Sequence, residues 1–212
     1  MNLAQYIDHT ILRADATPKD IVKVCREAME NHFAAVCVNP CYVSQAASIL
    51  KGSGVELATV IGFPLGASTI AVKVRETEDA IKNGATEIDM VMAIGFFKGG
   101  EFNHVEDEIR EVVRVAGTNP VKVIIETCYL SPEEISRAST IAVNQGAAFV
   151  KTSTGFGSRG ATVEDVKQIR AVVGNRCKIK ASGGIKTAEQ VLAMIEAGAL
   201  RIGTSSGVEI VS

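Results

Sequence analysis

Two lysines near the C-terminal ends of two apolar runs are the residues in this sequence that point most directly to chemistry. Lys151 lies in VKTSTGFG (150–157) and Lys180 lies in KIKASGGI (178–185), and each is followed by a turn of small residues that contains glycine. Lysine is usually exposed, but the apolar residues around these two predict burial. A buried lysine beside a second cation loses basicity, so its neutral amine can attack a carbonyl carbon.

The turns after these lysines indicate a second element of a binding site. A third apolar run ends in a similar turn without a lysine, RIGTSSG (201–207). Turns of small residues present backbone N–H groups that can bind phosphate. An activated amine beside such turns predicts covalent chemistry on a phosphorylated carbonyl compound. The alternatives are turns with a purely structural role and buried ion pairs of the lysines with Asp89 or Glu126.

The composition is that of a globular protein with no preference for polyanions. Of 212 residues, 47% are hydrophobic and 22% are charged, and the net charge is −2. These values predict one domain over residues 1–212 and argue against nucleic acid as a partner. No apolar run reaches the roughly 18 residues of a membrane span. The beginning of the chain, MNLAQYIDHT, does not read as a signal peptide, so we expect a cytoplasmic protein without membrane association.

The cysteines predict free thiols and no metal site. Their number, five, is odd and their positions are scattered, as expected in a reducing cytosol. Cys37 and Cys41 are the closest pair, but the three histidines are dispersed and no second cysteine pair accompanies them. Because structural zinc sites need about four ligands at typical spacings, we expect no bound metal.

Strand-like runs alternate with helical segments along the whole chain. Helix starts are indicated by a hydroxyl residue before acidic residues, and helix ends by Gly-Ala pairs at 84–85, 146–147 and 198–199. The expected starts are Thr17, Ser131, Thr162 and Thr187. The expected strands are Tyr6–Thr10, Ala34–Val38, Glu56–Phe63, Glu87–Ala93, Val121–Thr127, Ala147–Thr152, Cys177–Ser182 and Leu200–Thr204. Eight such units predict an α/β fold, a (β/α)8 TIM barrel.

Strand parity predicts charged side chains inside this barrel. Residues two apart share a face of a strand, so Glu87 and Asp89 lie opposite the apolar Ile88. The apolar faces should meet the helices and leave the charged groups inside. Barrel active sites lie at the C-terminal ends of the strands, where Asp89, Glu126, Lys151 and Lys180 are expected. A structural ion cluster or solvated strand ends are expected for the charged residues toward the opposite end, Glu87, Lys122 and Lys178.

Two lysines and a carboxylate define a specific mechanism. Free lysine, with a pKa near ~10.4, is almost entirely protonated at neutral pH, but burial and a second ammonium lower its pKa. One lysine would attack, while the other lowers its pKa and transfers protons, with Asp89 holding the second lysine and a water. The resulting Schiff base acts as an electron sink, so an adjacent C–C bond can break or form without a metal or other cofactor.

Eight segments at the strand ends together resemble the class I, Schiff-base deoxyribose-phosphate aldolases. They are YIDHTIL (6–12), AVCVNP (35–40), TVIGFPLG (59–66), EIDMVMAIG (87–95), VIIETCYL (123–130), FVKTSTGFG (149–157), KASGGIKT (180–187) and RIGTSSGVEI (201–210). The resemblance implies reversible cleavage of 2-deoxy-D-ribose 5-phosphate to D-glyceraldehyde 3-phosphate and acetaldehyde, in deoxyribonucleotide catabolism. It also implies a homo-oligomer, a dimer or tetramer, whose ligands are a phosphorylated sugar and aldehydes.

The same resemblance implies residue roles. Lys151 would form the Schiff base, Lys180 would assist it, and Asp89 would relay protons. Asp8 and Cys37 match positions that line the site, and the phosphate-binding positions are Gly155, Gly183, Gly184, Gly203, Ser205 and Ser206.

One position departs from the pattern of some members, and two other functions remain open. Phe156 stands where some members have a lysine, so Arg159 or Lys186 would have to supply the positive charge toward the phosphate. Another Schiff-base aldolase or a transaldolase would use a ketose fragment as donor in place of acetaldehyde. A phosphate-binding barrel without catalysis would bind its ligand and form no covalent adduct.

Overall fold

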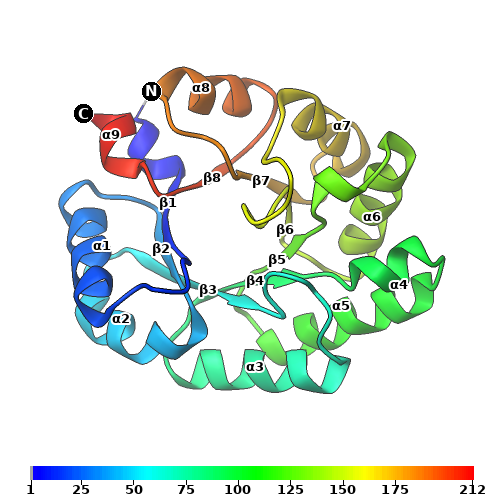
Figure 1. The fold of residues 1–212 in the computed structure, drawn as a ribbon, viewed down its shortest axis with the longest axis horizontal. Helices are drawn as coiled ribbons and strands as arrows, with labels where there is room; N and C mark the ends of the chain where they lie inside the picture. Colours follow the sequence, from blue (N-terminus) through cyan, green and yellow to red (C-terminus); the bar gives the residue numbers. More distant parts are fainter. Residues whose placement is uncertain (1) are drawn as a thin grey trace.

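Eight parallel strands form a closed barrel in which each strand pairs with its neighbours in the sequence, and the first strand closes on the last (Figure 1). The computed structural model describes residues 2–212. The strands are β1 (Ile7–Ile11), β2 (Ala35–Val38), β3 (Glu56–Ile61), β4 (Glu87–Val91), β5 (Val121–Ile124), β6 (Phe149–Lys151), β7 (Lys178–Ser182) and β8 (Arg201–Thr204). The predicted TIM barrel is therefore confirmed.

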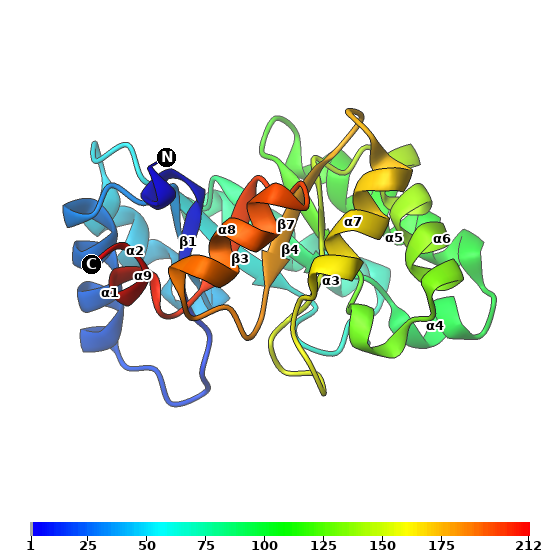
Figure 2. The same ribbon diagram turned by 90° about the horizontal axis from the view of Figure 1, so that it is seen from above.

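Helices surround this barrel (Figures 1 and 2). They are α1 (Pro18–Glu30), α2 (Val43–Leu50), α3 (Ile70–Lys82), α4 (Ile94–Lys98), α5 (Phe102–Ala116), α6 (Pro132–Asn144), α7 (Val163–Val173), α8 (Ala188–Glu196) and α9 (Gly207–Val211). Three short 3-10 helices complete the fold: η1 (Leu3–Tyr6), η2 (Pro40–Tyr42) and η3 (Thr127–Tyr129).

The local sequence signals fix the helix ends. All four predicted starts are N-caps whose hydroxyl oxygen accepts from the backbone N–H of the third helical residue, which bonds back to the cap. Gly84, Gly146 and Gly198 have φ of 107°, 85° and 117°, the left-handed backbone that lets the chain leave a helix. Four of the eight predicted strands are too long at their C-terminal ends, because the chain there turns into the loops that form the barrel mouth: Glu56–Phe63, Glu87–Ala93, Val121–Thr127 and Ala147–Thr152.

Two apolar regions lie on the two sides of the sheet. The larger packs the outward faces of the strands against the helices. A much smaller cluster lies inside the barrel and consists of Leu12, Cys37, Ala58 and Val60, with Phe63 against it. The barrel interior therefore has little apolar filling, and buried charged side chains occupy much of it, as strand parity predicts.

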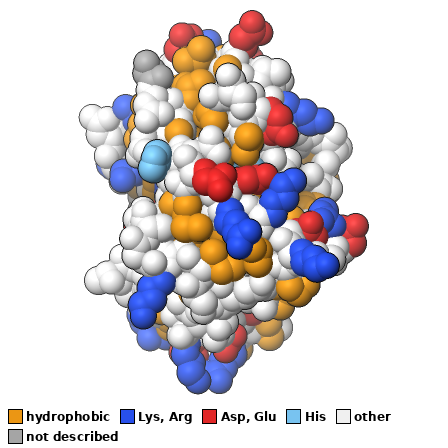
Figure 3. Space-filling view, turned by 90° about the vertical axis from the view of Figure 1, so that its left-hand side faces the viewer, with side chains coloured by type: hydrophobic (Ala, Val, Ile, Leu, Met, Phe, Trp, Pro, Cys, Tyr) orange, Lys and Arg blue, Asp and Glu red, His pale blue; other side chains and the backbone are white. Residues whose placement is uncertain are grey.

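The surface carries charges of both signs. Figure 3 shows the flank on the side of α1 and α2, where basic and acidic side chains are interspersed with small apolar areas. Within residues 2–212, no helix has the length and apolar character needed to cross a bilayer.

Candidate active site

The three residues predicted for catalysis meet inside the barrel. Lys151 ends β6, Lys180 is its register partner on β7, and Asp89 lies on β4. Asp89 Oδ2 is 2.8 Å from Lys151 Nζ and 2.8 Å from Lys180 Nζ, so one carboxylate oxygen bridges the two amines. Their side chains are 3% exposed for Lys151 and 0% for the other two.

A chain of buried ion pairs continues from this trio. Lys122, the register partner of Asp89, places its Nζ 2.7 Å from Asp89 Oδ1 and 2.6 Å from Glu87 Oε2. Arg201 also binds Glu87, and its Nη1 is 2.8 Å from Asp8 Oδ1. Asp8 accepts a hydrogen bond from Lys180, which closes the network.

Counting charges in this network identifies Lys151 as the group without a counterion of its own. Its carboxylates are Asp8, Glu87 and Asp89, and three cations other than Lys151 contact them, namely Lys122, Lys180 and Arg201. The network is electrically neutral only when Lys151 is an uncharged amine. Because an uncompensated buried charge is strongly unfavourable, burial favours that neutral form.

The pKa shifts agree with this charge count. Burial lowers the pKa of Lys151, and the ammonium of Lys180 lowers it further against the opposing effect of Asp89. Burial would also lower the pKa of Lys180, but Asp8 and Asp89 outweigh it and raise that pKa above its usual value. Burial would raise the pKa of Asp89, but the three lysines together hold it well below its usual range. The pair therefore consists of an amine with reduced basicity and an amine with increased basicity.

The structure refines the sequence-based interpretation of the other charged residues. Glu87 and Lys122 form the predicted ion cluster and Lys178 is exposed, but the cluster is continuous with Asp89. Glu126 is not a partner of either lysine, because its carboxylate accepts hydrogen bonds from Thr154. Sequence reasoning gave no role to Arg201. The sequence did contain a signal for such a role, because Arg201 begins β8 and lies on the same inward face as Gly203.

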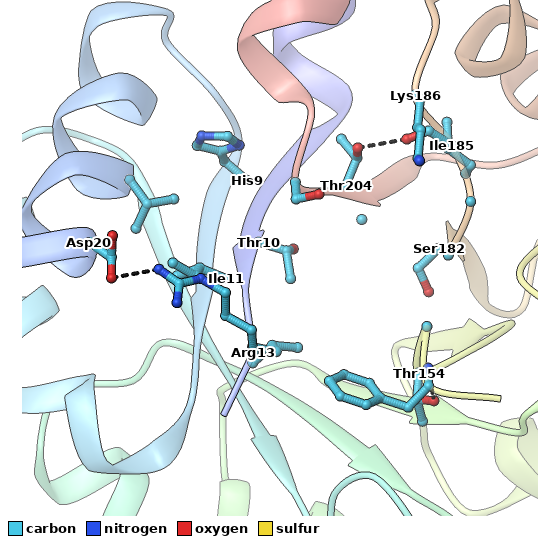
Figure 4. Close-up of a pocket in the computed structure, with 18 of the residues that line it drawn as sticks. His9, Thr10, Ile11, Arg13, Asp20, Thr154, Ser182, Ile185, Lys186 and Thr204 are labelled. Atoms are coloured by element: carbon cyan, nitrogen blue, oxygen red, sulfur yellow. Dashed lines mark hydrogen bonds and ion pairs between the residues drawn. The ribbon is translucent and has the colours of Figure 1, made fainter. Parts of the chain in front are cut away.

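A cavity of about 510 Å³ opens at the C-terminal ends of the strands, and Lys151 lines it. Figure 4 shows Ser182 and Lys186 on one side of this cavity and Arg13, paired with Asp20, on the other. The predicted phosphate-binding residues in its lining are Gly155, Gly183, Gly184, Gly203 and Ser205. Within residues 2–212, the backbone N–H groups of Gly155, Gly183, Gly184 and Ser205 donate to no other protein group. These turns can therefore bind an anion.

Several other predicted positions lie elsewhere. Ser206 is outside the cavity lining, and its N–H donates to Thr204 Oγ1 at 3.0 Å. Asp8 and Cys37 are fully buried and do not line the cavity. Asp8 instead holds Lys180, while burial raises the pKa of the Cys37 thiol to about 11. A Cβ on Gly203 would lie 3.1 Å from Lys180 Cε, so this glycine provides space for the lysine.

Lys186, and not Arg159, is positioned to supply charge to the cavity. Lys186 lines it, as predicted for one of the two candidates. The guanidinium of Arg159 bonds to Thr127 and to both carboxylate oxygens of Asp165, where it supports the start of α7.

Comparison with known proteins shows to which family this chain belongs. A model of the DeoC/LacD family of aldolases matches residues 2–212. The chain belongs to this family. It is 57% identical to a deoxyribose-phosphate aldolase of Caldanaerobacter subterraneus subsp. tengcongensis, over 100% of this chain and 93% of that protein. It is 54% identical to one of Streptococcus equi subsp. zooepidemicus, over 99% of this chain and 96% of that one.

Solved structures of family members have the same architecture. QR15, an aldolase, superposes with a TM-score of 0.96 at 44% identity, covering 99% of this chain and 94% of its own. A tetrameric deoxyribose phosphate aldolase from Aeropyrum pernix superposes with a TM-score of 0.92 at 32% identity, covering 99% and 89% respectively. The chain is therefore a family aldolase, a carbon–carbon lyase, over its full described length.

Proposed function

We propose that this aldolase reversibly cleaves 2-deoxy-D-ribose 5-phosphate to D-glyceraldehyde 3-phosphate and acetaldehyde, through a Schiff base on Lys151. The observation that carries this proposal is the charge count: within residues 2–212, Lys151 is the amine without a carboxylate of its own, and it lines a cavity with unpaired N–H groups. The proposed substrate is the one in the names of the related deoxyribose-phosphate aldolases.

The first step uses the neutral amine of Lys151. Its Nζ attacks the aldehyde carbon C1 of the open-chain sugar, and the resulting carbinolamine takes up one proton and loses water to give a protonated imine. Asp89 Oδ2, 2.8 Å from both lysine nitrogens, provides the path for proton exchange between Lys151 and Lys180. Lys180, which is cationic in the resting site, disfavours protonation of the free amine.

The second step breaks the C2–C3 bond. A base removes the proton of the C3 hydroxyl, C3 becomes the aldehyde carbon of D-glyceraldehyde 3-phosphate, and the bonding electrons move through C2 into the imine to form an enamine. Protonation at C2 and addition of water then release acetaldehyde and return the amine of Lys151. Because the imine accepts the electron pair, this sequence needs no metal or other cofactor.

The phosphate is assigned to the turns at Gly155, Gly183-Gly184 and Ser205, with Lys186 beside them. Their unpaired N–H groups support this assignment, and so do the positive φ values of Gly155, Gly183 and Gly184, 89°, 85° and 77°, which bring the backbone itself to the cavity surface. Phe156 contributes no charge, so the backbone provides most of the contacts.

The biological setting is part of the same proposal. The reaction would serve the breakdown of deoxyribonucleotides in the cytoplasm, which the five free cysteines favour. A homo-oligomeric state is supported by the tetrameric relative from Aeropyrum pernix and is measurable by light scattering after size-exclusion chromatography.

Borohydride reduction in the presence of acetaldehyde tests the mechanism. Peptide mass mapping should find a two-carbon group on Lys151, and Lys151→Ala should abolish it. Labelling of Lys180 with Lys151 unmodified would overturn the assignment. Binding of the phosphorylated sugar without any adduct would indicate a barrel that binds and does not catalyse, whereas turnover of a ketose donor would indicate a transaldolase.

A further inference from the structure

Glu126 combines an unfavourable backbone conformation with deep burial. Two non-glycine residues within residues 2–212 have a positive φ, His32 and Glu126. His32 follows the end of α1, where such a conformation is common. Glu126 instead follows β5 with φ 53° and ψ 70°, and it is 2% exposed. A side chain at positive φ is costly, and such residues persist where the surrounding structure needs them, often at functional sites.

The conformation turns the Glu126 side chain away from the ion network. Ile125 N donates to Lys151 O at 3.0 Å, and Thr127 N donates to Thr152 O at 2.9 Å, so the pairing of the two strands continues on either side of Glu126. In a regular strand, Glu126 would share the inward face with Lys122 and add a fourth carboxylate to a balanced network. In the left-handed conformation, its carboxylate reaches Thr154.

The carboxylate of Glu126 fixes the turn that follows Lys151. Thr154 N is 3.2 Å from each of its oxygens, and the Thr154 hydroxyl donates to it as well. That hydroxyl oxygen also accepts from Phe156 N at 3.0 Å. These bonds leave the N–H of Gly155, between the two bonded residues, without an acceptor among residues 2–212, and Gly155 lines the catalytic cavity.

The same turn separates two cavities. Thr154 and Phe156 line the catalytic cavity and also a second one of about 400 Å³, which Glu126 lines but Lys151 does not. A Cβ on Gly157 would lie 3.4 Å from the carboxylate carbon of Glu126, so the segment packs closely against it. Glu126 therefore holds the turn from the side opposite Gly155.

We infer that Glu126 is a positioning residue for the phosphate end of the substrate: it holds the Thr154–Phe156 turn so that Gly155 N–H points to the phosphate. This inference rests on the proposed function. Glu126 acts only through Thr154, so its loss affects the phosphorylated substrate selectively. The reaction of Lys151 with acetaldehyde is independent of it.

Glu126→Gly provides the main test, because glycine adopts the left-handed backbone without strain while it removes the carboxylate. We expect KM for 2-deoxyribose 5-phosphate to rise about tenfold, the equivalent of one hydrogen bond of ordinary strength. The kcat, and kcat/KM for unphosphorylated 2-deoxyribose, should change less than about threefold, since neither depends on that bond. Glu126→Gln keeps one acceptor oxygen and should recover part of the affinity.

Two further variants separate this role from backbone strain and from misfolding. His32→Gly relieves the same kind of strain far from the cavity and should leave the ratio of the two substrates unchanged. Thr154→Val removes the hydroxyl that Glu126 binds and should lower the preference for the phosphorylated substrate, even if Glu126→Gly does not fold. Adding Glu126→Gln to Thr154→Val should then have little further effect.

Borohydride trapping of acetaldehyde on Lys151 distinguishes this inference from the proposed function. If wild-type protein is not labelled, the proposed function fails, and this inference fails with it. If wild type and variants are all labelled but the ratio of the two substrates stays at its wild-type value, the inference alone fails. An equal loss of kcat/KM on both substrates also overturns the inference, as does a KM for the phosphorylated sugar in Glu126→Gln that is no better than in Glu126→Gly.

Discussion

Lys180→Met removes one cation from the neutral network while keeping a straight side chain of similar length. Three carboxylates, those of Asp8, Glu87 and Asp89, then face two cations, Lys122 and Arg201. A proton on Lys151 restores the balance. The pKa of Lys151 should therefore rise, and its neutral form should become scarce near neutral pH.

The geometry sets the size of this effect. Both lysine nitrogens are 2.8 Å from Asp89 Oδ2, so they are no more than twice that distance apart. At such a separation, two unit charges in an effective dielectric of ~20 repel by about 3 kcal/mol. Because ~1.4 kcal/mol corresponds to a factor of ten, the neutral fraction of Lys151 at neutral pH should fall about a hundredfold.

The sign of the pH dependence follows from the attacking form. In the proposed mechanism only neutral Lys151 attacks, so activity rises as pH increases through its pKa, and raising that pKa moves this rise to higher pH. We would measure kcat/KM for 2-deoxyribose 5-phosphate and the rate of borohydride trapping against pH. Both should fall in Lys180→Met near neutral pH and partly recover in alkaline buffer.

A matched control lies on the same face of the same strand. Lys178 is exposed at the beginning of β7, two residues from Lys180, so Lys178→Met should leave the pH profile unchanged. Thermal unfolding of both variants shows whether the barrel remains folded. An unchanged profile in folded Lys180→Met, or a loss of activity that is equal at all pH values, would refute the like-charge argument.

Three further substitutions test other parts of the site. Gly203→Ala places a methyl group 3.1 Å from Lys180 Cε; it should destabilise the fold by about 1–3 kcal/mol and lower kcat, measured by urea unfolding and steady-state kinetics. Lys73→Met leaves Glu108, whose pKa burial already raises, as an unpaired buried carboxyl group between α3 and α5. The free energy of unfolding, measured with urea, should fall by about 3–5 kcal/mol, and adding Glu108→Leu should restore most of it. An unfolding midpoint equal to that of wild type in the single variant would contradict this. Phe156→Lys should favour the phosphorylated over the unphosphorylated sugar by at most about 1.5–3 kcal/mol in the ratio of kcat/KM values. A lower ratio would place the phosphate elsewhere.

Local sequence signals determined most of the architecture. Hydroxyl caps such as Thr17 and Ser131, and glycines such as Gly84, act through neighbours in the sequence, so the helix ends follow from the sequence alone. Strand parity is equally local, and it correctly placed Asp89 and Lys180 on the inward face. The order of strands in a closed barrel then brings the C-terminal ends of β4, β6 and β7 to one mouth.

Which charges pair was decided only by the tertiary structure. Lys122 was expected in a structural cluster or at a solvated strand end, yet its register position beside Asp89 makes it part of the network that contains Lys151 and Lys180. Glu126 was a candidate partner of the lysines, but one left-handed residue directs its carboxylate to Thr154. A sequence contains no periodic pattern that indicates the register between distant strands or the backbone angle of a single residue. The sequence therefore singles out Lys151 and Lys180, and the pairing of strands far apart in the chain determines which of these lysines is left without a counterion.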